Sequence, residues 1–583
     1  MGRAARIWLL ALLGLCGAYH AGVSWRQSQY GWGNGLGNVS VHHSDGVIDA
    51  GYYASIAVMV RDGHGFKTNV SLLHKGDEVF PAPSSVYPLW PLTWGYLARV
   101  IPLDQLGAWL PALFYLVSLL AAYQWLHALW PRAFFPRHLP GFQAGHVLVC
   151  VLALSSFFTS TLYPIVEGLA YALMFCAFWR FNTLLARPSW RSGLECGAWL
   201  ALVLLARAQL VVAAGAMFLV LGYACVAIPG QRARYASMLG ASVAAFAALS
   251  APWFTYTWSF APHATITQVL AFAGVRPNQL LSPLEGVRSG AAAGGWLTDR
   301  LEGLMLAFRW RSPDSYWPQY YTFHYALIVA LLLALLAVVS SLRHAGLRAF
   351  RPWLTDCANV PRVFAIAYAS LAFLALHTMH TAAWYFHRRH GLGSLLLIAF
   401  ALAYVLAQRH IALRLVGVII LCSGVALGCW RLVRETQHAL REGPRPTPPI
   451  VHWLAAQTKG REPLVVAVRQ PQLIGYQLPH IGFHWFNQLT TRADVELMVT
   501  RLGASYVAVP SSMSEWWRSR GRNFKLLAHE GDDTIYRPNK RLRERAKRRF
   551  RAMKAPSRSA WSAWSEAGAS PSGPQASRRR PEP

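Results

Sequence analysis

Long apolar segments recur along the first three quarters of this chain, and they constrain its fold more than any other feature. A helix needs about 20 apolar residues to cross a bilayer, at about 1.5 Å per residue. The segment 195–228 is too long for one crossing, and Arg207 and Gln209 interrupt it. We therefore interpret it as two short helices that meet at 206–209. Counted in this way, the sequence predicts an α-helical polytopic membrane protein with about 11 transmembrane helices. The expected spans are 1–23 (a signal peptide or a first anchor), 104–130, 145–163, 165–186, the pair in 195–228, 236–257, 321–342, 363–384, 391–408 and 412–432.

The charged residues fit a membrane protein better than a nucleic-acid-binding protein. Only 14% of the residues are charged and 54% are hydrophobic, yet the formal net charge is +30. No nucleic-acid-binding motif accompanies this charge, so we expect no nucleic acid partner. With the N-terminus in the cytoplasm, every predicted inner loop is basic, as the positive-inside rule requires, and anionic membrane lipid is an expected partner. These loops are 131–138, 186–193, 230–235, 343–353 and 407–414.

The same topology divides the chain into three predicted parts. Residues 1–432 form a transmembrane module whose large first extracytoplasmic loop is 25–103. Residues 433–539 have the pattern of a small extracytoplasmic α/β domain, with helices at 447–457 and 493–503, strands at 463–469 and 505–510, and a terminal hairpin at 524–538. Residues 540–583 are a basic tail whose composition predicts disorder. We find no internal repeat, which disfavours a transporter built from inverted repeats.

The first outer loop contains the most distinctive polar pattern. Asp45 and Asp49 lead into the amphipathic stretch GYYASIAVMV. If the chain is helical there, both carboxylates lie on one face, because residues at i and i+4 stack. The two residues are therefore candidate acids, or one of them caps the helix while the other is solvated.

Several short motifs lie on the predicted outer face: Asp49–Ala57, Asp62–Gly65, Val86–Pro91, Tyr163–Ala170, Leu205–Gln209 and Arg388–His390. They resemble motifs of the GT-C class of polytopic glycosyltransferases, in particular protein O-mannosyltransferases and aminoarabinose transferases. Many relatives have Asp-Glu where this chain has Asp49-Ala50, and Trp516-Trp517 does not belong to the Trp-Trp-Asp-Tyr-Gly motif of oligosaccharyltransferases. We therefore do not expect transfer of a whole oligosaccharide to asparagine.

The resemblance implies an integral, multi-pass membrane enzyme, expected in a bacterial inner membrane with its active site on the extracytoplasmic face. Such an enzyme transfers a hexosyl or pentosyl group, with inversion, from a polyprenyl-phosphate sugar donor to a lipid, glycan or protein acceptor. An acceptor hydroxyl needs a carboxylate base, and a phosphate leaving group is stabilised by guanidinium groups. We assign Asp49 as the base. The other candidates are Asp45 and Glu167 as further acids, Arg207, Arg388, Arg389 and His390 for the donor phosphate, and Tyr52, Tyr53 and Tyr87 for substrate binding.

Less specific explanations stay open for several of these residues. Arg207 could reach lipid headgroups from an interface, and Glu167 could be a favourable charge at a helix start. No cofactor is required, although outer-face histidines could bind a divalent metal ion. A transporter or flippase of a lipid-linked precursor is the alternative function. The histidines are His42, His43, His64, His74, His377, His380, His387 and His390, and two glycosylation sequons start at Asn38 and Asn69.

Overall fold

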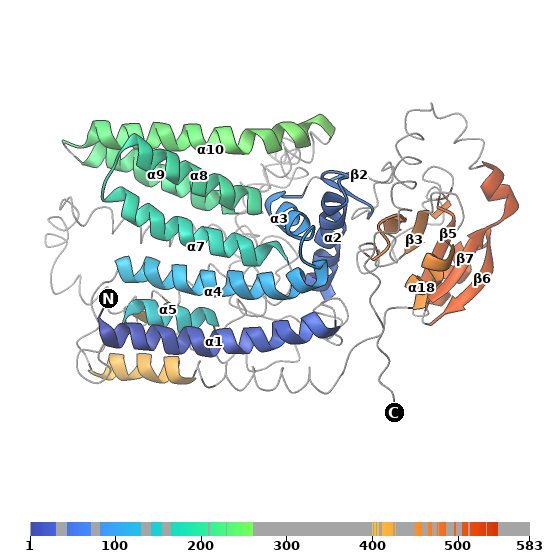
Figure 1. Ribbon diagram of the computed structural model, residues 1–583, viewed down its shortest axis with the longest axis horizontal. Helices are drawn as coiled ribbons and strands as arrows, with labels where there is room; N and C mark the ends of the chain where they lie inside the picture. Colours follow the sequence, from blue (N-terminus) through green and yellow to red (C-terminus); the bar gives the residue numbers. More distant parts are fainter. Residues whose placement is uncertain are drawn as a thin grey trace, which may run out of the picture. The chain divides into compact units, whose positions relative to one another are not determined.

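The computed structural model divides into two compact units (Figure 1). The helical unit comprises Met1–Gly46, Ser85–Trp90 and Asp104–Pro444, and the mixed unit comprises Val47–Ser84, Pro91–Leu103 and Arg445–Pro583. The structure describes residues 2–30, 44–70, 82–84, 86–129, 142–153, 165–207, 210–228, 230–260 and portions of 399–545.

The helical unit consists of long apolar helices whose axes run almost parallel in Figure 1. Their apolar side chains interlock, and large aromatic residues such as Tyr115, Trp125 and Phe178 are fully buried between them. The helices are α1 (Arg3–Tyr30), α4 (Leu103–Leu129), α5 (Ala144–Ala153), α7 (Val166–Leu185), α8 (Trp190–Ala206), α9 (Val211–Ala227) and α10 (Arg232–Phe260).

Four of the described helices are long and apolar enough to cross a membrane, and they match the spans predicted at 1–23, 104–130, 165–186 and 236–257. The predicted break in 195–228 is confirmed, because α8 ends at Ala206 and α9 begins at Val211. Most of 321–408 lies outside the described residues, so the total of about 11 crossings stays a prediction. The four helices are Arg3–Gly22, Leu103–His127, Val166–Leu185 and Arg232–Phe260.

Helices α8 and α10 pack with their backbones close together. Gly193 and Gly197, one turn apart on α8, face the carbonyl oxygens of Met238 and Ser242 on α10. A Cβ atom at either glycine would overlap the carbonyl opposite it. Small residues four apart are the usual means by which membrane helices approach each other this closely.

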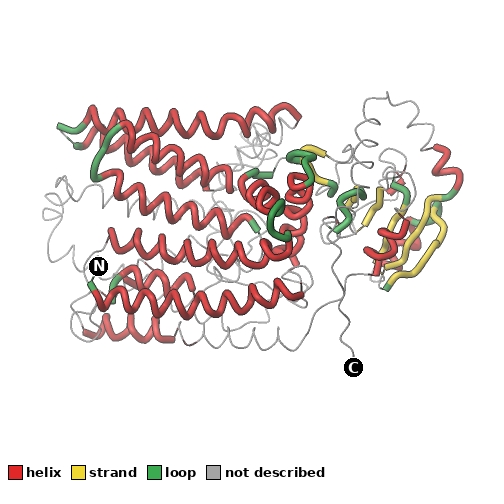
Figure 2. Tube along the Cα trace, in the orientation of Figure 1, coloured by secondary structure: helices red, strands yellow, loops and turns green. Residues whose placement is uncertain are grey.

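The mixed unit joins part of the first predicted loop to the C-terminal sheet. Helix α2 (Ser44–Arg61) enters this unit at Val47 and is followed by a two-stranded sheet, β1 (Lys67–Thr68) with β2 (Ala82–Pro83), and by α3 (Leu89–Leu97). The C-terminal sheet has five strands in the order β4-β3-β5-β7-β6, parallel from β4 to β5 and antiparallel from β5 to β6. Figure 2 shows strands of this sheet in yellow. The strands are β3 (Val465–Val468), β4 (Gly482–Trp485), β5 (Tyr506–Pro510), β6 (Phe524–Glu530) and β7 (Asp533–Pro538), with helices α18 (Pro449–Gln457) and α21 (Ser514–Arg520).

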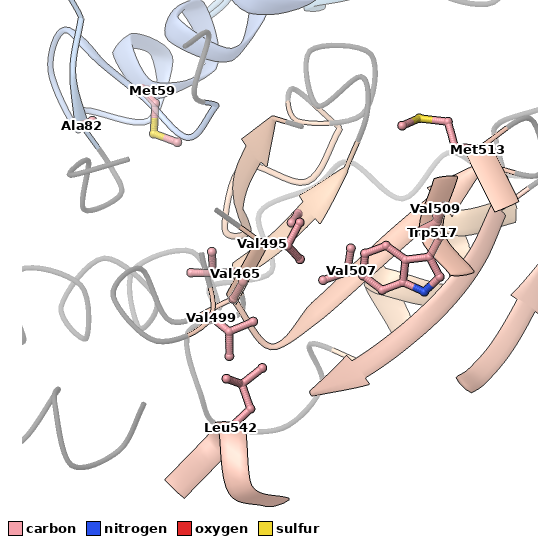
Figure 3. Packing of buried hydrophobic residues seen from close by; sticks show 12 residues of the cluster. Met59, Ala82, Val465, Val495, Val499, Val507, Val509, Met513, Trp517 and Leu542 are labelled. Atoms are coloured by element: carbon pink, nitrogen blue, oxygen red, sulfur yellow. The ribbon is translucent and has the colours of Figure 1, made fainter. Parts of the chain in front are cut away.

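The core of this sheet is formed by apolar side chains that alternate along its strands. Val507 and Val509 of β5 are buried in the same cluster as Trp517 of α21 (Figure 3). The Trp517 ring also contacts the tilted ring of Tyr536 on β7. The predicted strands at 463–469 and 505–510 and the terminal hairpin are confirmed. Strand β4 and helix α21 were not predicted, and the boundaries of the predicted domain at 433 and 539 stay a prediction.

Candidate functional site

Helices α7 and α8 form an antiparallel hairpin that brings two charged side chains together. The connection between them is short, and Ser189 starts α8 because its Oγ accepts the backbone N–H of Ser192 at 3.1 Å. Glu167 and Arg207 are equally far along the chain from Arg187 in this connection. Because the two helices run side by side in opposite directions (Figure 1), the start of α7 meets the end of α8.

Glu167 and Arg207 form a buried ion pair. Arg207 Nη1 lies 3.0 Å from Glu167 Oε1, and their side chains are only 7% and 3% exposed, respectively. Arg207 Nη1 also donates to the hydroxyl of Tyr171 at 3.4 Å, and the guanidinium carbon lies 5.9 Å from the centre of the Tyr171 ring. Burying two charges costs free energy that their attraction only partly returns, and removing one partner of such a pair costs about 3–5 kcal/mol.

Each charge of this pair lies at the helix end that favours it. Glu167 is in the first turn of α7, where the helix dipole stabilises a negative charge. Arg207 follows the last residue of α8, where the dipole stabilises a positive charge. The backbone of Arg207 is extended, with φ −158° and ψ 119°, so this residue ends the helix and directs the chain towards α9. The two dipoles therefore help to hold a pair that apolar surroundings disfavour.

The sequence assigned separate roles to Glu167 and Arg207, and the structure brings them together. Arg207 is enclosed by protein, which does not fit the alternative of a side chain that reaches out to lipid headgroups. The alternative for Glu167, a favourable charge at a helix start, holds in part, because its position does favour a carboxylate. In addition, Glu167 forms an ion pair with Arg207.

Asp45 and Asp49 both lie within α2, in its first and second turns. We expected Asp49 to precede the helix, but α2 begins five residues earlier, at Ser44. The helix does place the two positions on one face, as their spacing predicts. Their side chains are not among those that the structure describes.

The three candidate substrate-binding tyrosines differ in their surroundings. Tyr52 is 7% exposed, its hydroxyl lies 3.3 Å from Ser84 Oγ, and its ring contacts the partly exposed Tyr53. The hydroxyl of Tyr87 is buried and has no hydrogen-bond partner among the described residues. Burial raises the pKa of Tyr87 well above its ordinary value, so this phenol stays protonated.

The remaining candidates lie mostly outside the described residues. This holds for Arg388, Arg389 and His390, and for all of the candidate metal-binding histidines except His64. Burial lowers the pKa of His64. Within the described part of the chain, no three His, Cys, Asp or Glu side chains gather into a possible metal site.

Tyr171 is a contact that our sequence analysis missed. It follows Glu167 by four residues on α7, so it lies one turn away on the same face. The four-residue spacing from Glu167 could have predicted the contact with Tyr171. The equal sequence separations of Glu167 and Arg207 from the α7–α8 connection could have predicted their pairing. Both signals require knowing first that the two helices form a hairpin.

Searches of protein-family models and of curated proteins find no match. Among solved structures, the chain is similar to the archaeal oligosaccharyltransferase AglB from Archaeoglobus fulgidus, solved with an inhibitory peptide and a dolichol-phosphate. The TM-score is 0.49 and the identity 10%, over 88% of this chain and 70% of that one. It is also similar to ArnT from Cupriavidus metallidurans, with a TM-score of 0.44 and 12% identity over 85% of this chain and 94% of that one.

Proposed function

We propose that this chain is an integral membrane glycosyltransferase that transfers a hexose or pentose from a polyprenyl-phosphate donor to a lipid, glycan or protein acceptor. The reaction inverts the anomeric carbon and takes place on the extracytoplasmic face of a bacterial inner membrane. The observation that carries the proposal is the buried pair of Glu167 and Arg207 in a bundle of apolar helices. Ionisable side chains are costly in such surroundings and mark places where a charged group is handled.

The chemistry assigns different tasks to the two kinds of charge. Departure of the donor leaves a polyprenyl phosphate, whose negative charge a guanidinium can bind through paired N–H donors. Arg207 is the proposed phosphate-binding residue, and Glu167 and Tyr171 fix the direction of its guanidinium. Arginine has five N–H donors, so it can bind a phosphate and keep its contact with Glu167.

Activation of the acceptor needs a base, because a hydroxyl group is a poor nucleophile. Asp49 is the proposed base, since it lies on α2 in the segment that carries the GT-C-like motif. It accepts the proton of the acceptor hydroxyl as the new glycosidic bond forms and the bond to phosphate breaks. Asp45, one turn before it, is the nearest alternative.

A direct test uses the full-length chain in lipid vesicles with polyprenyl-phosphate donors that carry different radiolabelled sugars. We expect label to move to an acceptor while polyprenyl phosphate is released in equal amount. The same vesicles can report whether intact donor crosses the bilayer. Movement of donor without release of polyprenyl phosphate would favour the flippase alternative and contradict the proposed transferase.

A further inference from the structure

Asn69 holds the first predicted loop against the C-terminal domain. Its side chain is fully buried, and its Nδ2 donates to the carbonyl oxygens of Gly475 at 2.9 Å, Leu478 at 3.1 Å and Ile481 at 2.8 Å. These carbonyls belong to two successive turns, closed by backbone bonds from Leu478 to Gly475 and from Ile481 to Leu478. Three acceptors therefore converge on one nitrogen that carries two hydrogens, a site that only a donor can occupy.

The backbone next to Asn69 continues this attachment. The carbonyl of Asn69 accepts the N–H of Phe483 at 2.8 Å, and Val70 forms a parallel bridge with Phe483. Phe483 lies in β4, which is the edge strand of the five-stranded sheet. The loop thus pairs with the edge strand of the described sheet through a single bridge residue, Val70, which is a minimal form of the edge pairing by which one segment binds another.

A second set of contacts connects this attachment to α2. Ser55 Oγ of α2 lies 2.9 Å from Thr68 Oγ1, and Thr68 Oγ1 also accepts the N–H of Val70 at 3.0 Å. Further along, Tyr52 of α2 contacts Ser84 through their hydroxyl oxygens. A continuous series of buried hydrogen bonds therefore runs from α2 through β1 to the C-terminal sheet, and all of these residues belong to the mixed unit.

We infer that Asn69 is a positioning residue that couples the C-terminal domain to α2, so that this domain sets the position of the proposed base Asp49. The inference rests on the proposed function, because it assigns the coupling to the same reaction. A small displacement of a reacting group lowers a rate by about 100-fold even when the substrate still binds. The C-terminal domain then contributes to the reaction rate by positioning the proposed base.

The same geometry explains a misleading feature of the sequence. Asn69-Val70-Ser71 is a glycosylation sequon, yet in the folded protein the nitrogen that would carry a glycan donates to three carbonyls and is buried. The asparagine is required for its amide donor, and the sequon pattern around it needs no glycan.

The test replaces the amide by an acceptor of the same shape. Asn69→Asp puts carboxylate oxygens opposite three carbonyls, so we expect faster hydrogen exchange both at 481–485 and in α2. We expect kcat to fall about 10- to 100-fold, with the KM for the donor within about twofold of the original. The control is Asn523→Asp, which removes a donor to Glu496 in the same unit and should change neither α2 exchange nor kcat.

A disulfide can restore the coupling by another route. A Cβ at Gly475 would overlap Cγ2 of Val70, which the Val70→Cys substitution removes, so cysteines at these two positions are close enough to bond. In the Asn69→Asp background, we expect oxidation of Val70→Cys/Gly475→Cys to restore α2 protection and kcat, and reduction to abolish both. If Asn69→Asp loosens 481–485 but leaves α2 exchange and kcat unchanged, the coupling does not exist. If the original chain transfers no sugar, the proposed function fails, while α2 exchange with and without the disulfide still decides the coupling.

Discussion

One buried polar site in the helical unit and one in the mixed unit differ in how their polar groups are compensated. In the helical unit, Glu167 and Arg207 bring full charges into apolar surroundings and neutralise each other. In the mixed unit, the nitrogen of the neutral Asn69 amide is held by backbone carbonyls, while its Oδ1 is buried without a hydrogen-bond partner among the described residues. A buried ion pair is costly and stabilises a fold weakly, whereas a satisfied neutral hydrogen bond contributes about 1 kcal/mol at little cost. This difference is consistent with the two proposed roles, in which the first region binds a charged ligand and the second fixes geometry.

The largest expected effect tests whether the chemistry depends on α2. Asp49→Asn should lower transfer about 100- to 10,000-fold, because an amide keeps the shape of the side chain and cannot accept the proton. The measurement is the initial rate of sugar transfer, alongside donor binding, which should persist. The control Asp45→Asn should have a milder effect. Reversed effects would make Asp45 the base, and two unchanged rates would refute the glycosyltransferase proposal.

The next effect concerns the ion pair. Glu167→Gln leaves Arg207 buried without its opposite charge, so we expect a loss of about 3–5 kcal/mol in the free energy of unfolding. Adding Arg207→Met removes the stranded charge and should restore much of the stability, while donor binding stays weak. Thermal unfolding in detergent and donor titration measure the two quantities. A double variant that still binds donor normally would show that the pair serves the fold alone.

A pH effect is expected in the mixed unit at His484 of β4. Burial lowers its pKa from 6.5 to about 4. Between pH 6.5 and pH 4, His484 is protonated in the unfolded chain and neutral in the folded chain. The free energy of unfolding is therefore highest above pH 6.5 and falls as the pH is lowered towards 4. The loss from this group reaches up to about 3 kcal/mol. His484→Gln should flatten the pH dependence of unfolding over this range when it is compared with the original chain. An equally steep profile in His484→Gln would contradict this assignment.

The smallest effect concerns the close contact of α8 with α10. Gly197→Ala places a methyl group against the carbonyl of Ser242, so we expect a loss of about 1–3 kcal/mol from overpacking. Gly222→Ala on α9 is the matched control, since no atom of the described residues beyond its own turn of helix lies within 4 Å of its Cβ position. Alanine there should be neutral or slightly stabilising, by up to about 1 kcal/mol. The melting temperatures of the two variants should therefore move apart, and equal shifts would mean that α8 and α10 separate readily.

The sequence predicted those features that depend on nearby residues. Apolar length located α4, α7 and α10, and the excess length of 195–228 together with Arg207 and Gln209 located the break after Ala206. Strand β4 was not predicted because its four residues, GFHW, are too few to show the alternation of apolar and polar residues that is typical of a strand. The pairing of Glu167 with Arg207 was not predicted, because it depends on which helices lie next to each other in the fold. For Asn69, the local pattern indicated a modification site, and its actual partners could not be found from nearby residues at all.

The contacts of Asn69 with the C-terminal domain also determine when this part of the protein can fold during synthesis. Its partner Gly475 is 406 residues further along the chain. At synthesis rates of about 5–20 residues per second, the ribosome needs about 20 to 80 seconds to reach it. During that interval Val70 has no sheet edge to pair with, and the three carbonyl groups that accept hydrogen bonds from the Asn69 amide have not yet been synthesised. Any enzyme that modifies this asparagine must act within that window, and a group added then would prevent the last domain from docking.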